Sequence, residues 1–149
     1  MIRNETEYKE ALKRLAEDQK FLEAQEKHFK NAGYSGEKLE FALAPTQTFH
    51  QQLREEVQAY EKLKRGEIGD FYNLEGVGRT LVALRIARGL TQKDLSERLD
   101  VHETQVSRDE RNEYRGVTVE KVTKILNALN VKIISQVETP VLPEDISQN

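Results

Sequence analysis

Hydrophobic residues recur at helical spacing in the first part of the chain. In residues 5–30 they return every seven positions, which is the spacing of one face of a long helix. These positions are Tyr8, Leu15, Leu22 and Phe29. Asn4, followed three residues later by Glu7, has the form of a capping pair at the start of such a helix. The pattern predicts a single helix over residues 5–30.

Glycine and proline divide the next stretch into shorter elements. Pro45 lacks the amide hydrogen that a helix interior needs, so a short helix capped by Ser35 is expected to end near Leu43. A further helix then runs to about Gly66. Its apolar face carries Phe49, Leu53, Val57 and Tyr60. We expect a helical hairpin with a short bridging helix, in which the apolar faces of the two long helices pack together. The alternative is that the first face contacts a second protomer or another partner.

The rest of the chain reads as a linker, several short helices and one strand. Residues 66–78 hold four glycines and predict the linker. The predicted helices lie at 78–88, 91–99, 102–114 and 118–129. The β-branched composition of residues 132–138 predicts a short strand, and two prolines after it predict a mobile tail. The expected units are therefore a helical arm and linker at 1–75, a helical domain at 76–131, and a strand with a tail at 132–149.

The most informative pattern lies within residues 84–114, where two short helices are joined by a tight turn. Apolar residues are spaced to pack these helices on each other, which leaves one face of the second helix free. Polar residues crowd that face at Glu103, Thr104, Gln105 and Arg108. A short helix with exposed hydrogen-bond donors and acceptors suits the major groove of DNA.

A wider set of residues keeps an ungapped spacing from about 78 to 131. It comprises Arg85, the GLTQ run at 89–92, Leu95, Leu99, Val101 and the V-S-x-x-E run at 106–110. This segment resembles the helix-turn-helix of the Xre (Cro/phage-repressor) superfamily, and the N-terminal half is similar to bacterial Xre-type regulators with a helical extension. The expected fold is all-α: an N-terminal helical hairpin, a helix-turn-helix domain of the phage-repressor type and a short C-terminal strand.

The resemblance implies a role for each matching residue. The base-facing positions are Glu103, Thr104, Gln105 and Arg108. Arg108 is suited to a bidentate contact with guanine, and Gln105 to one with adenine. The residues implied to contact the DNA backbone are Gln92, Arg111, Asn112 and Arg115. Arg85 and Glu110 would form a partly buried ion pair with a structural role.

Two residues depart from the family pattern. Asp100 stands where glycine is commonest, and an aspartate can adopt the left-handed turn at some cost. Asp109 stands where the family has a large apolar residue. The packing around Asp109 is therefore expected to differ, with an extra negative charge near the groove.

Composition and charge limit which other classes of function are expected. The net charge is −3, so a DNA-binding site must be a local patch; residues 76–131 hold 10 Lys and Arg against 8 Asp and Glu. The chain has no Cys, and its three His residues stand apart from carboxylates at metal-ligand spacing. No apolar run is long enough to cross a membrane, and the expected location is cytoplasmic. Nothing in the sequence points to an enzyme, a metal or a cofactor.

These features predict a sequence-specific DNA-binding transcriptional regulator, in the simplest case a dimeric repressor of an inverted-repeat operator. The alternative is the antitoxin of a type II toxin–antitoxin pair, which binds its toxin and represses its own operon. A weaker alternative is a scaffold that binds DNA nonspecifically. The expected partners are double-stranded DNA, a second copy of the chain and, for an antitoxin, a toxin. The dimer is expected to form through antiparallel pairing of the strand at 132–138, with the helical arm as the rival.

Overall fold

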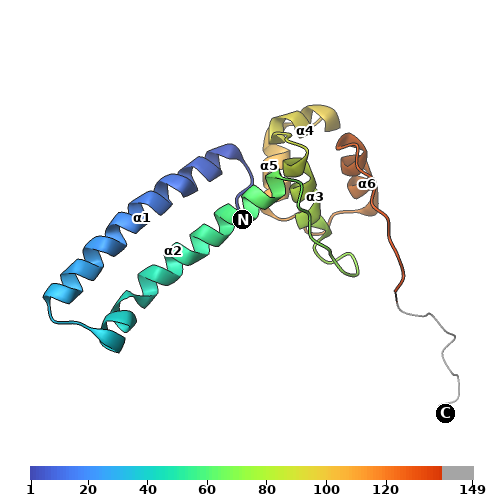
Figure 1. Ribbon diagram of the computed structural model, residues 1–149. Helices are drawn as coiled ribbons and strands as arrows, with labels where there is room; N and C mark the ends of the chain where they lie inside the picture. The colour runs from blue at the N-terminus through green and yellow to red at the C-terminus, as the bar shows by residue number, and fades with distance from the viewer. Residues whose placement is uncertain (139–149) are drawn as a thin grey trace, which may run out of the picture.

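The computed structural model describes residues 1–138, which contain six α-helices and no strand. Two long antiparallel helices form a hairpin that projects from a compact bundle of four short helices (Figure 1). The hairpin consists of α1 (Glu5–Asn31) and α2 (Gly36–Lys64). The bundle consists of α3 (Val77–Ala87), α4 (Gln92–Leu99), α5 (Glu103–Arg111) and α6 (Val119–Ala128). The all-α prediction is confirmed. None of these helices is long and apolar enough to cross a membrane.

The start of α1 is capped as its sequence predicts. The side chain of Asn4 accepts a hydrogen bond from the Glu7 N–H at 2.9 Å. The helix ends before Gly33, which has a φ of 87° and turns the chain back toward α2. The Tyr34 ring stacks on Phe29 with a centroid distance of 5.0 Å and so closes the tip of the hairpin.

The expected break at Pro45 is wrong, because α2 continues through it from residue 36 to residue 64. Pro45 faces solvent, while Leu43 before it and Val57 after it are both buried. Packing along one continuous face therefore outweighs the local cost of the missing hydrogen bond, which is about 3 kcal/mol. There is no separate bridging helix, and a short turn alone joins α1 to α2.

The apolar faces of α1 and α2 pack on each other within the chain, as predicted for most of their residues. The Tyr8 and Tyr60 rings lie 5.2 Å apart, and Leu15, Leu53 and Val57 join the same core. The expected contribution of Phe49 to this packing is wrong, because its side chain is 69% exposed. Two successive four-residue steps, from Val57 back to Leu53 and Phe49, drift about 80° around a helix, which turns Phe49 to the flank of the packed face.

The bundle and the base of the hairpin share one hydrophobic core. Leu81, Leu95 and Ile125 are almost completely buried in the bundle, and they belong to the same cluster as Val57 of the hairpin. Ile2, which precedes α1, is also buried in this cluster. Figure 1 shows the N-terminus at the junction between the hairpin and the bundle. The first residues of the chain thus help to hold the two parts together.

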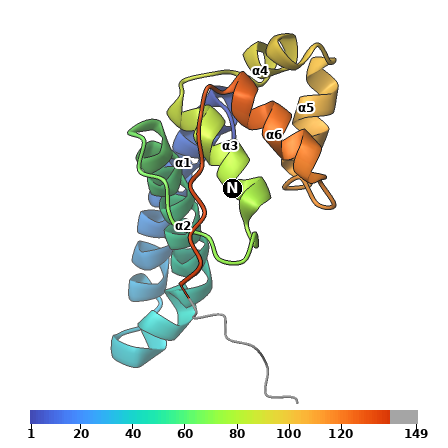
Figure 2. The same ribbon diagram turned by 90° about the vertical axis from the view of Figure 1, so that its right-hand side faces the viewer.

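The strand expected at residues 132–138 is not present, and this segment forms neither helix nor strand. Ile134 and Val137 are 93% and 76% exposed. In both ribbon views the segment leaves the end of α6 as an extended trace (Figure 2). A lone strand has no neighbour to bind its backbone N–H and C=O groups, so β-branched composition alone does not produce one. The expected mobile tail after it lies outside the described residues.

Candidate nucleic-acid interface

The α4 and α5 helices are held at a fixed angle by their caps and by the turn between them. The Thr91 side chain accepts from the Asp94 N–H, and the Asp94 carboxylate accepts from the Thr91 N–H at 2.7 Å. These hydrogen bonds from Thr91 hold the pKa of the Asp94 carboxyl below its usual value. Asp100 ends α4 with φ 54° and ψ 48°, which is the left-handed turn predicted for it. Leu95 and Val106 are buried between the two helices.

Three of the four residues predicted to face bases lie on the solvent-exposed surface of α5: Glu103, Thr104 and Arg108. Thr104, Arg108 and Arg111 are spaced by four and three positions, so they share one side of the helix. This side carries two arginines that make no ion pair within the part of the chain that the structure describes. It offers donors and acceptors at the surface, as base edges and phosphates require.

The side chains of Gln105 and Thr104 are less available for contacts with DNA than the other polar side chains of this helix. Gln105 is half-buried and lines a groove between α5 and α6. The Thr104 hydroxyl lies 2.9 Å from Nδ1 of His102, which also accepts from the Thr104 N–H and so caps α5. A contact from Thr104 to DNA therefore competes with its hydrogen bond to His102, and a contact from Gln105 requires its side chain to leave the groove.

The residues expected at the DNA backbone lie in three different surroundings. Gln92, at the first position of α4, donates from Nε2 to the Glu110 carboxylate at 2.8 Å. Arg111 and Asn112 are exposed at the end of α5. Arg115 follows a tight turn and lines a hollow beside α3. The structure thus groups Arg111 and Asn112 with the exposed side of α5 and places Arg115 beyond it.

Arg85 and Glu110 form a buried ion pair that joins α3 to α5. Nε of Arg85 lies 2.5 Å from Oε1 of Glu110, and Nη2 donates to Oε2 at 2.7 Å. The two side chains are 2% and 0% exposed. With the Gln92 amide as a further donor, the Glu110 carboxylate is satisfied without water. This network fixes the end of α5 against α3 and α4.

The guanidinium of Arg85 also binds two backbone carbonyls. Nη1 donates to Leu90 at 2.7 Å, and Nη2 donates to Arg3 at 2.8 Å. The Arg3 carbonyl belongs to the segment that precedes α1, so the buried ion pair is in direct contact with the start of the arm. Sequence reasoning missed this contact and that of Gln92, because neither spacing is part of a local pattern.

The negative charge expected near the groove at Asp109 is compensated. Its carboxylate accepts from Nζ of Lys121 in α6 at 2.7 Å. An ion pair between α5 and α6 thus stands where the family has an apolar contact. Next to it, Tyr114 is buried, and its burial, together with the charges of Glu110 and Asp109, raises the pKa of its phenol above the usual value.

A family model described as helix-turn-helix matches residues 81–135. This segment is a helix-turn-helix domain. The match runs from α3 through α6, with α4 and α5 as its central pair of helices, and it confirms the Xre-type resemblance. The domain supports a DNA-binding protein of the transcriptional-regulator class. A search of curated proteins and of solved structures found no significant match.

The helix-turn-helix match covers a little over a third of the chain, so the hairpin lies outside it. Within residues 1–138, no three His, Asp or Glu side chains are grouped to hold a metal ion.

Proposed function

We propose that this protein is a sequence-specific repressor that binds as a dimer to an inverted-repeat operator. The observation that carries the proposal is the exposed polar side of α5, held in place by the buried Arg85–Glu110 pair within a helix-turn-helix domain. In this arrangement α5 enters the major groove, and the dimer places two such helices one helical turn of DNA apart, about 34–36 Å.

The side chains of α5 divide between reading bases and holding the backbone. Arg108 is the principal reader, since its guanidinium is exposed and can form two hydrogen bonds with guanine. Glu103, Thr104 and Gln105 read neighbouring bases, and Gln105 must first turn out of its groove. Arg111 and Asn112 contact phosphates. Gln92 contacts a phosphate only through the Nε2 hydrogen that does not bind Glu110.

Substitution of Arg108 distinguishes the recognition of bases from the electrostatic attraction that any DNA sequence exerts. Arg108→Ala is expected to cost about 1–3 kcal/mol in binding to the selected site and to relax base choice at one position of each half-site. Arg111→Ala is expected to weaken binding to all sequences alike and to reduce the salt slope by about one. Both are measured by titration of selected and scrambled DNA at several salt concentrations.

Arg14→Ala is the matched control, because Arg14 is exposed on the arm, and it should leave binding unchanged. Equal affinity of the unaltered protein for selected and scrambled DNA at every salt concentration would contradict sequence-specific repression. An unchanged base preference in Arg108→Ala would move the reading role to another residue.

A second candidate function, that of an antitoxin, is favoured by the surface of the hairpin. Phe21, Phe41 and Phe49 are 57%, 84% and 69% exposed, which suits the binding of a protein partner. An antitoxin is expected to form a stable complex with a small toxin encoded beside it, as measured by light scattering. Phe49→Ser, on α2, should weaken that complex, and Leu12→Ser, at a less exposed position on α1, should not. The antitoxin function fails if no such complex forms, or if both variants bind equally well.

A further inference from the structure

One side of α2 is exposed along most of its length. The positions on this side follow each other in steps of four and three residues, which keeps them in one line along the helix. We call it the outer face of α2, and it consists of Phe41, Pro45, Phe49, Gln52, Glu56, Ala59 and Leu63. Phe41 and Phe49 are 84% and 69% exposed. Figure 1 shows α2 at the free edge of the projecting hairpin, with α1 along its other side.

The outer face has the spacing of a contact between helices. Its positions form two series with a seven-residue repeat, which are Pro45, Gln52 and Ala59 in one and Phe49, Glu56 and Leu63 in the other. A seven-residue repeat of mostly apolar positions is the pattern along which a second helix packs. The α2 helix already packs on α1 through a different side, where Leu43 and Val57 are buried. The outer face therefore has the pattern for one further helix.

The two ends of the outer face have complementary shapes. At the end nearer the helix-turn-helix domain, a groove of about 650 Å³ is lined by Ala59 and Leu63. Toward the other end, the rings of Phe41 and Phe49 stand out into solvent. A face that has a groove at one end and projecting rings at the other fits a copy of itself, provided that the two faces run antiparallel.

The charges at the two ends are complementary as well. Lys38 lies one turn before Phe41, with its Nζ 4.1 Å from the centre of the Tyr34 ring, and it makes no ion pair within residues 1–138. Glu67 lines the groove at the opposite end, where its Oε1 is 2.8 Å from Nε of Arg65. An antiparallel pair of outer faces brings Lys38 of each copy near Glu67 of the other, whereas a parallel pair brings like charges together.

We propose that the outer faces of two copies of this chain pack antiparallel about a two-fold axis near Gln52, so that the two hairpins form a four-helix bundle. A two-fold axis pairs positions that lie equally far from it on opposite sides. Phe41 therefore meets Leu63, and Pro45 meets Ala59. The two Gln52 amides meet at the axis, where each donates to and accepts from the other. This assembly goes beyond the function proposed above, and only its role on DNA rests on that function.

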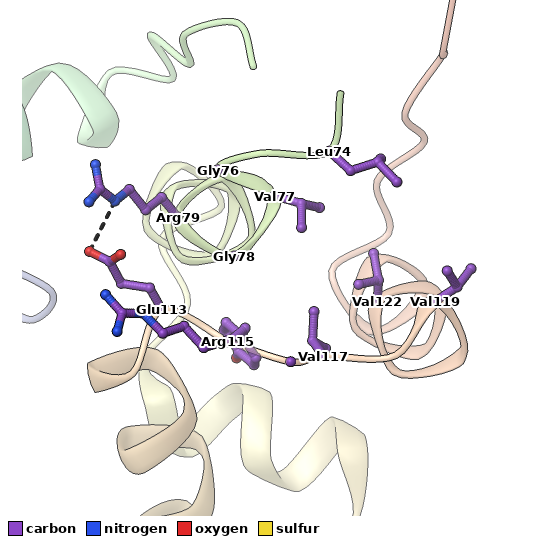
Figure 3. A pocket seen from close by; sticks show the side chains of 12 residues that line it. Leu74, Gly76, Val77, Gly78, Arg79, Glu113, Arg115, Val117, Val119 and Val122 are labelled. Carbon is purple, nitrogen blue, oxygen red and sulfur yellow. Dashed lines mark ion pairs between the residues drawn. The ribbon is translucent and has the colours of Figure 1, made fainter. Parts of the chain in front are cut away.

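The bundle joins two copies without using their helix-turn-helix domains. The α2 helix ends at Lys64, about 18 Å beyond Gln52, so the two domains lie at opposite ends of the bundle. The hollow drawn in Figure 3 lies between α3 and α6, and no residue of the hairpin lines it. The bundle thus forms whether or not the domains also touch each other. On DNA, binding of one copy then favours binding of the second copy at a neighbouring site.

A carboxylate placed in the outer face is expected to break the bundle. Phe49→Glu should raise the dissociation constant for the contact between arms about tenfold or more, because an unpaired charge would be buried there. Ile134→Glu is the matched control, since it makes a similar change at a side chain that is 93% exposed beyond α6, and it should leave the assembly unchanged. Light scattering and sedimentation of the full chain without DNA measure both variants over a wide concentration range.

Cross-linking tests the antiparallel register, because the chain has no Cys of its own. Gln52→Cys should be linked to its copy by a short bismaleimide, and Gln58→Cys, on another side of α2, should not. Pro45→Cys and Ala59→Cys should link to each other in a mixture of the two variants. Neither should link to itself, since two equivalent positions away from the axis lie far apart in an antiparallel pair.

A charge exchange tests the contacts at the ends of the bundle. Lys38→Glu should weaken the assembly, because it places two carboxylates together at each end. Adding Glu67→Lys to the same chain should restore the assembly, because each end then holds one carboxylate and one ammonium group again. Sedimentation of the single and the double variant measures both effects.

The proposal is overturned if the unaltered chain is monomeric at every concentration, or if Phe49→Glu and Ile134→Glu assemble alike. It is also overturned if Gln58→Cys is linked as readily as Gln52→Cys, or if Pro45→Cys links to itself. DNA recognition is measured separately on a single half-site, where Phe49→Glu should bind as the unaltered chain does. A chain that forms the bundle but does not distinguish a half-site from scrambled DNA would contradict only the function proposed above.

Discussion

Glu110→Ala is expected to lower the free energy of unfolding by about 3–5 kcal/mol, the typical cost of removing one partner of a buried ion pair. The substitution leaves the Arg85 guanidinium buried with only two backbone carbonyls as acceptors, and it removes the acceptor of the Gln92 amide. Thermal or urea unfolding measures the loss. DNA binding at a temperature where the variant is still folded should change little, because Glu110 does not face solvent.

The control for this prediction is Glu97→Ala, which removes an exposed carboxylate 4.0 Å from Lys93. It should change stability by no more than about 0.5 kcal/mol. The double variant Arg85→Met with Glu110→Leu should recover much of the loss, since no charge stays buried. A Glu110→Ala protein as stable as the unaltered one would show that the ion pair is open to water in solution.

Gly78→Ala is expected to destabilise the protein by about 3 kcal/mol, at the upper end of the range for overpacking. A Cβ at residue 78 would lie 1.8 Å from the carbonyl oxygen of Glu113 and 3.2 Å from Cβ of Tyr114. The obstacle is backbone, so relief requires α3 and the turn after α5 to move apart. Circular dichroism during heating measures the effect.

Gly69→Ala is the matched substitution, because no atom lies within 4 Å of a Cβ placed there and the φ of Gly69 is not positive. It should leave the thermal midpoint unchanged or raise it slightly. If Gly78→Ala and Gly69→Ala melt alike, the close approach of α3 to residue 113 is not a fixed feature of the fold.

The helix-turn-helix could be predicted because its determinants are local. The Thr91 cap, the left-handed Asp100 and the apolar spacing at Leu95 and Val106 act over a few residues, and the structure contains each of them. The exposure of Glu103, Thr104 and Arg108 on α5 follows from the same spacing.

The predictions that failed concern features that tertiary contacts determine. Pro45 is a helix breaker by local rules, yet α1 packs along α2 and holds it continuous. Residues 132–138 have strand composition, yet composition does not supply a neighbouring strand. The hydrogen bond from Arg85 to Arg3 joins residues 82 positions apart, and no periodic pattern reaches that far.

The contact of Ile2 and Arg3 with the domain decides how separable the two halves of this chain are. A fragment that starts at residue 76 keeps all four helices of the bundle, but it loses the Ile2 side chain from the core and one acceptor from the Arg85 guanidinium. The expected boundary at residue 76 therefore cuts through contacts that hold the core together. Transplanting the helix-turn-helix into another protein would therefore require the segment before α1 as well, or a substitute for its two contacts.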